Sequence, residues 1–289
     1  MTGIAQGDTA RWRGSGSLVG LLEGYGFIAP ALALVTIFLL FPIARLIAEG
    51  FSAGGSGLAA YGEIIGSAYY QDILLRTFRL SAITAGLCTF VAYPIALRLR
   101  SVSARTRGYL NLLFLSPLLV NAVVRAMGWV ILLGPTGLEG LISQVLGVDV
   151  KLVYSDTGVV IGLADVFLGY MILSLEAGII SIDETLLQAA RSLGASELQV
   201  LRRVIVPLSL PNMVVGATLV FMLSASTYIT PTLLGGSGSQ LAAPKVYELA
   251  VVLIDFRSAA ALVLVLIVGV SIVVGAVSLV LLRGIGRHR

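Results

Sequence analysis

The chain has 289 residues, a mean hydropathy of +0.99 and only 12% charged residues, which excludes an ordinary soluble domain and indicates a polytopic membrane protein. The net charge of +4 does not indicate nucleic-acid binding, because the basic residues lie beside apolar runs, where membrane topology explains them better. Cys88 is the only cysteine and His288 the only histidine, so a disulfide or thiolate metal cluster within the chain and imidazole chemistry within the membrane are excluded.

The apolar runs predict an all-α polytopic membrane bundle with six transmembrane helices. Each run is long enough to cross a hydrocarbon core of about 30 Å. The six spans are expected at residues 27–44, 80–97, 109–133, 157–180, 209–228 and 259–282. They form a transmembrane domain over residues 25–284, between an N-terminal tail of residues 1–24 without a removable signal peptide and a short tail of residues 285–289. Pro94 is expected to bend the second span or open it locally.

The loops between these spans predict additional short helices. Residues 45–79 and 134–156 are expected on the outer side, the latter with room for a short helix. In the loop of residues 230–257, Pro244 predicts the start of a helical stretch over Lys245–Ile254.

The distribution of basic residues predicts the orientation. Twelve of the nineteen Lys and Arg fall in the two tails and in the loops that follow spans two and four, where only five acidic residues occur. The positive-inside rule therefore places both termini in the cytoplasm, in a multi-pass protein of the bacterial inner membrane.

Residues 181–207 form the most elaborate loop on the cytoplasmic side. Ser181 with Glu184 predicts a capping box and a helix that begins near Ile182, and Gly194 is expected to end that helix in a left-handed turn. A second capping box, Ser196 with Gln199, predicts another short helix before prolines that lead into span five. The loop is therefore a helix, a glycine turn and a helix, suited to docking a partner.

The spacing in this loop resembles the EAA loop of membrane subunits of bacterial ATP-binding cassette importers. That motif has Glu-Ala-Ala, three residues, Gly, nine residues, Ile, one residue and Leu-Pro; this chain keeps every spacing, with Gln188 in place of the Glu and Val in place of Ile and Leu. The resemblance implies that the loop couples the chain to an ATPase, through Glu184, Gln188, Ala189, Ala190, Gly194, Ala195, Val204 and Pro207. The change to Gln188 removes a charge, and with it any salt bridge that the family's Glu makes.

Further short matches extend the resemblance to the spermidine/putrescine-type branch of these permeases over most of residues 27–283. They are Thr77-Phe78-Arg79-Leu80, Tyr93-Pro94-Ile95-Ala96, Val124-Arg125, Gly128-Trp129, Leu132-Leu133-Gly134, Thr230-Pro231 and Leu233-Leu234-Gly235-Gly236. The resemblance implies a second permease subunit in a heterodimer, two nucleotide-binding ATPase subunits, and a periplasmic or lipid-anchored solute-binding protein, all acting at a lipid membrane. It also implies alternating access, with ATP and Mg on the partner ATPase and no cofactor on this chain.

The chain itself carries no pattern of an enzyme. A phosphate-binding GxxxxGK[ST] loop is absent from the sequence, so ATP hydrolysis is assigned to another subunit.

Ionisable residues at membrane depth are candidates for a substrate path. By helical rise, Arg125 lies about 24 Å along span three from its inner end and Asp165 about 12 Å along span four from its outer end, depths similar enough to pair. Glu176 follows Asp165 by eleven residues, which places both carboxylates on one face. Two interpretations are open: a polar lining for translocation, or a structural ion pair with Glu176 near the cytoplasmic interface.

Hydroxyl groups at the end of span five form a second candidate face. Ser224, Thr227 and Tyr228 are spaced by three and four residues, and they are expected either to contact solute or to bond to the helix backbone or a neighbouring span. The candidate path therefore comprises Arg125, Asp165, Tyr170, Ser224, Thr227 and Tyr228.

The solute is expected to be small and polar. Polyamine-type relatives often carry an acidic residue shortly before the Thr-Pro of span five, and this chain has none there. This leaves room for an amino-acid derivative, an opine or a phosphonate beside a polyamine. A secondary transporter or channel, and a membrane scaffold or sensor that holds a soluble partner, are the competing functions.

Overall fold

A computed structural model of the chain describes residues 30, 32–41, 44, 45, 48, 59–236 and 240–286, with side chains described as far as Leu279. The chain divides into two compact units, Met1–Glu49 and Gly50–Arg289. The described residues of the first unit are helical, with a π-helical turn η1 at Thr36–Leu40. The predicted first span, residues 27–44, and both predicted tails lie wholly or partly outside the described residues.

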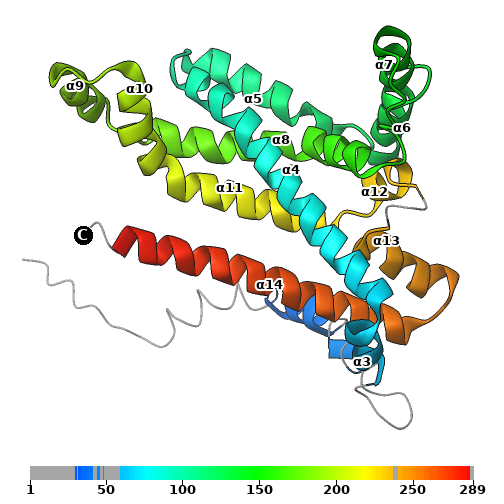
Figure 1. Cartoon of the computed structure of the whole chain (residues 1–289). Helices are drawn as coiled ribbons and strands as arrows, with labels where there is room; N and C mark the ends of the chain where they lie inside the picture. The colour runs from blue at the N-terminus through cyan, green and yellow to red at the C-terminus, as the bar shows by residue number, and fades with distance from the viewer. Residues whose placement is uncertain are drawn as a thin grey trace, which may run out of the picture. The chain divides into compact units, whose positions relative to one another are not determined.

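Three long helices form the centre of the second unit: α4 (Ala68–Arg100), α8 (Asp156–Ile180) and α11 (Val206–Ser226). α4 crosses α8 and α11, which lie side by side, and most of the main core cluster comes from these three helices (Figure 1). α4 continues as one helix through Pro94. The centre of the unit is therefore a three-helix packing in which every pair is in contact.

Shorter helices cover this centre. The remaining elements are α3 (Ala59–Gly66), α5 (Ala104–Leu119), α6 (Ala122–Leu133), α7 (Leu138–Leu146), α9 (Glu184–Ser192), α10 (Glu197–Val200), η2 (Leu201–Ile205), α12 (Ile229–Leu234), α13 (Ala242–Tyr247), η3 (Glu248–Val252) and α14 (Phe256–Gly286). α5 packs on α8, α6 contacts α12 and α8, and α14 contacts α3, α13 and α11. Figure 1 shows α9 and α10 at one end of the long helices and α6, α7, α12 and α13 at the other.

Within the described residues, five helices or helix runs are long and apolar enough to cross a membrane: 68–100, 122–146, 156–180, 197–226 and 256–279. Four of these runs overlap predicted spans two, four, five and six, and the run 122–146 overlaps predicted span three only over residues 122–133; the result agrees with an all-helical polytopic fold. Predicted span three is not one helix, because α5 ends at Leu119 and α6 begins at Ala122. Asn121 caps α6 by accepting hydrogen bonds from the Val123 and Val124 amides, and this local competition with the helix interrupts the span.

Glycines allow α8 and α11 to approach closely. A Cβ on Gly216 of α11 would lie 2.8 Å from the Ser174 Cβ, and one on Gly178 of α8 would lie 2.5 Å from the Asn212 Cβ. The Ser174 hydroxyl donates to the Asn212 carbonyl at 2.7 Å. Small residues and hydroxyl bonds at helix contacts are typical of membrane bundles, where close backbone packing replaces the hydrophobic drive.

Candidate coupling site and translocation path

The segment of residues 181–207, here called the coupling segment, starts differently from its prediction. Asp183, not Ser181, is the N-cap of α9, and its side chain accepts a hydrogen bond from the Thr185 amide at 2.9 Å. Ser181 instead ends α8, where its hydroxyl donates to the Gly178 carbonyl. The predicted Ser181–Glu184 capping box is therefore wrong, because the helix starts two residues later than expected and Asp183 competes for the cap. The hydrogen bond from Thr185 lowers the pKa of Asp183.

The turn that follows α9 has the predicted left-handed glycine. Gly194 has a φ of +82°, its amide donates to the Arg191 carbonyl at 2.9 Å, and the Ala195 amide donates to the Ala190 carbonyl at 3.1 Å. These two bonds make a Schellman motif, which satisfies carbonyl groups at the helix end. A Cβ at Gly194 would meet no atom within 4 Å, so the requirement for glycine comes from the backbone conformation alone.

The second helix begins as predicted. Ser196 and Gln199 form a reciprocal capping box at the start of α10. Across the turn, Arg191 pairs with Glu197 through bonds of 2.8 and 3.1 Å, which lowers the pKa of Glu197 and raises that of Arg191. α10 then runs through η2 into α11, with Pro207 near the first turn of that helix.

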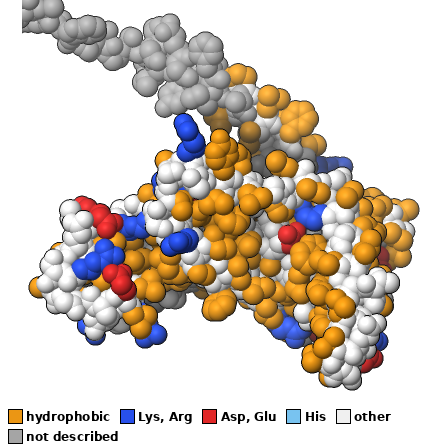
Figure 2. Space-filling view, turned by 90° about the horizontal axis from the view of Figure 1, so that it is seen from above, with side chains coloured by type: hydrophobic (Ala, Val, Ile, Leu, Met, Phe, Trp, Pro, Cys, Tyr) orange, Lys and Arg blue, Asp and Glu red, His pale blue; other side chains and the backbone are white. Residues whose placement is uncertain are grey.

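The coupling segment has a small core of its own. Ile182, Leu187 and Val200 are buried in a cluster to which Ala190, Ala195, Val204 and Ile205 also belong. Gln188 and Ala189 are exposed on the other side of α9, and Glu184, Gly194 and Pro207 are exposed as well. Leu186, Leu193 and Leu198 remain exposed, and Leu193 most of all, at 89%. Figure 2 shows basic and acidic side chains gathered at this end, whereas the surface between the two ends is mostly apolar.

Arg125 and Asp165 form the predicted pair. The Arg125 Nε lies 3.6 Å from the Asp165 Oδ2, to which the Trp129 Nε1 also donates at 3.1 Å. Arg125 further donates to the Pro117 and Val120 carbonyls at the break between α5 and α6. Arg125 therefore satisfies carbonyls at the end of an interrupted helix, and Arg125 and Asp165 both line a cleft of about 360 Å³.

The carboxylate face of α8 meets basic residues of α5 and α6. Glu176, whose side chain is 8% exposed, lies 3.7 Å from the Arg107 Nε of α5. Asp165 meets Arg125 of α6, so both carboxylates have a cation opposite them, as a charge at membrane depth requires. Tyr170, on the same helix, is half-buried against Phe167, with ring centroids 6.5 Å apart.

The hydroxyl groups expected at the end of span five do not lie on one continuous helical face, because α11 ends at Ser226, but Thr227 makes the bond to the helix backbone that is one of the two expectations. Ser224 is fully buried, and its Oγ has no hydrogen-bond partner within the described part of the chain. Thr227 is extended, and its hydroxyl donates to the Leu223 carbonyl at 2.7 Å. Tyr228 lies beyond the helix end, and its ring lies 4.6 Å from that of Tyr247.

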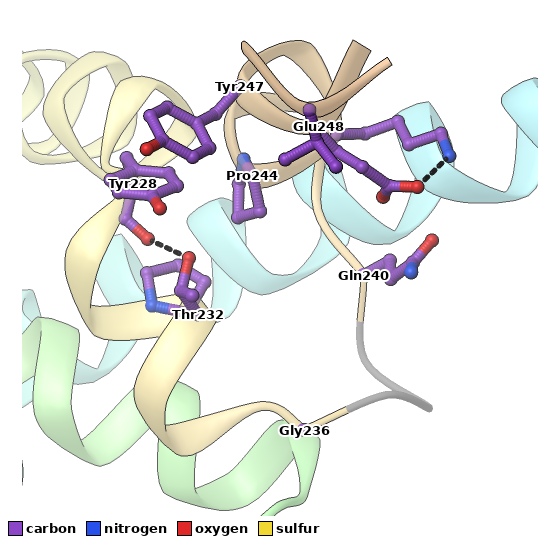
Figure 3. A pocket seen from close by; sticks show the side chains of 10 residues that line it. Tyr228, Thr232, Gly236, Gln240, Pro244, Tyr247 and Glu248 are labelled. Carbon is purple, nitrogen blue, oxygen red and sulfur yellow. Dashed lines mark hydrogen bonds and ion pairs between the residues drawn. The ribbon is translucent and has the colours of Figure 1, made fainter.

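Tyr228 and Tyr247 line a cleft of about 210 Å³ at the α12–α13 end, here called the tyrosine cleft (Figure 3). Its other lining residues are Pro231, Thr232, Gly236, Gln240, Pro244, Lys245, Glu248 and Val252. Lys245 donates to Glu248 at 2.9 Å and lies over the Tyr69 ring, 5.3 Å from its centroid. Burial lowers the pKa of Lys245, but the bonds to Glu248 and Tyr69 outweigh it and raise the pKa overall.

Most residues of the tyrosine cleft were not predicted from the sequence as site residues. The available signal was Pro244, which correctly predicts a helical stretch, now seen as α13 and η3. No local pattern indicates that this stretch returns to face Tyr228.

The described residues contain no group of three or more His, Cys, Asp and Glu side chains placed to hold a metal ion.

Comparison with known sequences gives a family match and similar proteins. Residues 87–285 match the family described as "Binding-protein-dependent transport system inner membrane component". The chain is 28% identical over 228 residues to the spermidine/putrescine transport system permease protein PotB of Escherichia coli K12, covering 78% of this chain and 81% of the relative. It is 31% identical over 171 residues to the PotB of Haemophilus influenzae, covering 58% and 60%.

The fold matches solved structures as well. A bacterial ABC transporter involved in import of the acidic polysaccharide alginate has a chain that superposes with a TM-score of 0.75 at 16% identity, covering 92% of this chain and 98% of that one. A bacterial alginate ABC transporter in complex with an alginate pentasaccharide-bound periplasmic protein gives 0.72 at 18% identity, covering 90% and 95%. At these identities the likeness establishes the fold alone.

Proposed function

Because the chain belongs to the family of binding-protein-dependent transport system inner membrane components, we propose that its coupling segment is the docking site of the ATPase that drives import. The chain is a multi-pass inner-membrane permease subunit of an ATP-driven ABC importer, and the ATPase activity resides on a partner subunit. The observation that carries the docking assignment is the self-contained fold of the coupling segment, two capped helices joined by a Schellman turn at Gly194.

The exposed side chains of the coupling segment favour docking of a soluble protein. Leu186, Leu193 and Leu198 are 50%, 89% and 55% exposed at an end that also presents charged side chains. A mixed apolar and charged patch of this kind is typical of a protein interface and is unlike a surface that faces lipid tails. Ala189, small and exposed beside Gln188, leaves room for a partner to approach the α9 backbone.

The same docking assignment orients the molecule. With the α9–α10 end in the cytoplasm, the six expected spans place both termini there, and the α12–α13 end faces the solute-binding protein. The importer would then contain this chain, a second permease subunit in a heterodimer, two ATPase subunits, and a periplasmic or lipid-anchored binding protein. The basic residues Arg98, Arg100 and Arg105 near the α9–α10 end agree with a cytoplasmic location.

The tyrosine cleft is the proposed entry of the path for a small polar solute. Tyr228 and Tyr247 offer aromatic faces that suit a cationic amine, and relatives of the chain are named for spermidine and putrescine. Glu248 is already paired with Lys245, so these two cleft charges cancel, which keeps amino-acid derivatives, opines and phosphonates as candidates. Arg125, Asp165, Tyr170, Ser224 and Thr227 remain candidate path residues.

Replacement of Gly194 by valine tests the docking assignment. The β-branched residue disfavours a φ of +82°, so the two helices lose their relative orientation, and ATP-dependent uptake into proteoliposomes should be abolished while the protein stays inserted. Gly147→Val is the matched control: Gly147 also ends a helix with positive φ, at +65°, also has no atom within 4 Å of its Cβ position, and lies outside the coupling segment. Equal uptake by the two variants would overturn the assignment.

Measurements on the whole complex separate the competing functions. Uptake that proceeds in proteoliposomes without any ATPase subunit would indicate a secondary transporter or channel. Co-purification of a soluble partner with no uptake under any condition would indicate a scaffold. Uptake that requires the ATPase, ATP and the binding protein supports the importer. An unlabelled compound that inhibits uptake of the labelled solute by competition then identifies the class of solute.

A further inference from the structure

A continuous chain of ion pairs runs from α4 through α9 to α10. It consists of Arg100, Glu184, Arg191 and Glu197, here called the ionic relay. The Arg100 Nη2 lies 2.7 Å from the Glu184 Oε2, the Glu184 Oε1 lies 3.6 Å from the Arg191 Nη1, and the Arg191 Nε lies 2.8 Å from the Glu197 Oε1. The charges alternate at each step, so each inner member is shared by two partners.

Arg100 anchors the relay in the helix bundle. Besides Glu184, its guanidinium donates to the carbonyls of Ile179 at 2.9 Å and Ile182 at 3.0 Å. The Ile179 carbonyl lies in the last turn of α8, where a cation is favourable and acceptors lack helical partners, and the Ile182 carbonyl lies between α8 and α9. The Arg100 side chain is 19% exposed, less than any other member of the relay. Its planar fork serves three acceptors at once, one in α8, one in α9 and one in the connection between them.

The connectivity of the chain shows why such an anchor matters for α4. The coupling segment joins α8 directly at Ser181 and joins α11 through η2, so movement of the segment reaches these helices along the backbone. α4 is the third helix of the central packing, and it has no covalent link to the segment. Arg100, the last residue of α4, provides a link through its side chain.

The other end of the relay closes the glycine turn. Arg191 precedes Gly194 and Glu197 follows it, and their two-bond pair spans the turn. Exposed ion pairs stabilise a fold only slightly, because water and salt screen them. The link to α4 therefore depends most on Arg100, which is the least exposed member and also bonds to two backbone carbonyls.

We propose that the ionic relay makes α4 move together with the coupling segment during the ATP cycle, with Arg100 as the positioning residue. This inference rests on the proposed function, in which the coupling segment receives the ATPase. Without the relay, movement of the segment would reach α4 only through its packing against α8 and α11, and less solute would be moved per ATP hydrolysed.

The test uses the complete importer in proteoliposomes, with uptake and ATP hydrolysis measured together. Arg100→Ala is expected to lower solute uptake per ATP hydrolysed by about 10-fold, a coupling of ordinary size, while hydrolysis continues. Arg98→Ala, which removes an exposed arginine of the same helix, is the control and should match the parent chain. Parental uptake per ATP in Arg100→Ala, or an equal loss in Arg98→Ala, would overturn the proposal.

A second variant keeps the test decisive if Arg100→Ala does not assemble. Glu184→Gln retains the size of an exposed side chain and removes only the ionic link between Arg100 and Arg191. It is expected to lower uptake per ATP by about 3-fold, because the bonds of Arg100 to the Ile179 and Ile182 carbonyls remain. Unchanged coupling in this variant would show that the ion pairs are not used.

A charge exchange separates a relay from independent pairs. Arg191→Glu with Glu197→Arg rebuilds the pair across the turn but places Glu184 beside a second carboxylate. If the relay acts as one unit, solute uptake per ATP in the double variant is lower than in the parent chain. Uptake per ATP equal to that of the parent chain would mean that the turn pair acts alone, which contradicts the proposal.

Distance measurements read the motion itself. The single native cysteine, Cys88, is buried, so spin labels on cysteines introduced at Arg98 and Ser192 report the separation of α4 and α9. The distance should stay constant between ATP-free and ATP-trapped complexes and should change between these states when Arg100→Ala is added. A failure of the proposed docking would instead leave uptake unaffected by Gly194→Val, so the two hypotheses fail separately.

Discussion

The coupling segment and the tyrosine cleft lie at opposite ends of the long helices and are held together by contacts of different range (Figure 1). In the coupling segment, the Ser196–Gln199 box, the Arg191–Glu197 pair and the Ala195–Ala190 bond join residues at most six positions apart. At the cleft end, Tyr69 bonds to Gln240 across 171 positions and Thr77 to Ala242 across 165. The coupling segment can therefore keep its shape while it moves, whereas the cleft changes shape when the helices around it move.

This difference suits an importer that is driven from one end. A piece that receives force should be rigid on its own, and local caps with a left-handed glycine provide that rigidity. A piece that binds and releases solute should respond to the arrangement of distant helices. The following predictions test this contrast, from the largest expected effect to the smallest.

The largest effect is expected where a long-range charge pair is broken. Asp165→Asn leaves the Arg125 guanidinium, which is 13% exposed, without its counter-charge, and should lower the free energy of unfolding by about 3 kcal/mol. The decrease in the midpoint temperature of thermal unfolding in detergent measures this loss of stability. Asp149→Asn, the same change at an exposed position, is the control, and equal midpoints for the two variants would contradict the assigned pairing.

A smaller effect is expected where one buried hydrogen bond ties the cleft to α4. Thr77→Val removes the hydroxyl that accepts from the Ala242 amide at 2.9 Å, and the unsatisfied amide should cost about 2 kcal/mol. Thr84→Val is the matched control, since Thr84 is equally buried on α4 and its hydroxyl has no hydrogen-bond partner in the described residues. The midpoint temperature of thermal unfolding should be clearly lower for Thr77→Val than for Thr84→Val. The reverse order would refute the stabilising role of the long-range hydrogen bond between Thr77 and Ala242.

Loss of a local cap should have a smaller and more confined effect. Ser196→Ala removes one half of the capping box and should destabilise α10 by about 1 kcal/mol. Faster amide hydrogen exchange within residues 196–200, with the tyrosine cleft unchanged, is the expected result. Ser181→Ala should have less effect on this exchange, because Ser181 bonds only to the end of α8 in this structure. Spread of the exchange to the cleft would argue against an autonomous coupling segment.

The smallest effect is expected from acid. The pKa values of Asp183 and Glu197 are lowered in the fold, so their stabilising contributions are present above the usual values of 3.8 and 4.5 and are lost as the pH falls through the lower folded values. Hydrogen exchange of residues 184–200 should therefore be constant near neutral pH, after correction for intrinsic rates, and should rise only below about pH 4. In Arg191→Ala the part due to Glu197 should disappear, and an unchanged acid response would contradict that assignment.

The local features of the fold could be predicted from the sequence because each depends on residues within one or two helical turns. Hydropathy predicts the approximate positions of spans two, four, five and six. The left-handed turn at Gly194 follows from the lack of a Cβ, and the Ser196–Gln199 box from side-chain oxygens beside free amides. Where two caps compete within three residues, as Ser181 and Asp183 do, the pattern alone selects the wrong one. The break at Asn121 is of the same kind, since a capping side chain interrupts a run that hydropathy describes as continuous.

Tertiary structure alone decided which distant groups meet. Similar depths predicted that Arg125 and Asp165 could pair, but the part played by Trp129 and the Pro117 carbonyl depends on how α5, α6 and α8 pack. The tyrosine cleft brings together Tyr228 and Tyr247 from two different helical segments, and Arg100 bonds to Ile179 and Glu184, which lie far from it in the sequence. Hydrophobic periodicity gives no information about such distant contacts. Sequence determines these local preferences because they are short-range, whereas the relative placement of helices is set by packing over the whole bundle.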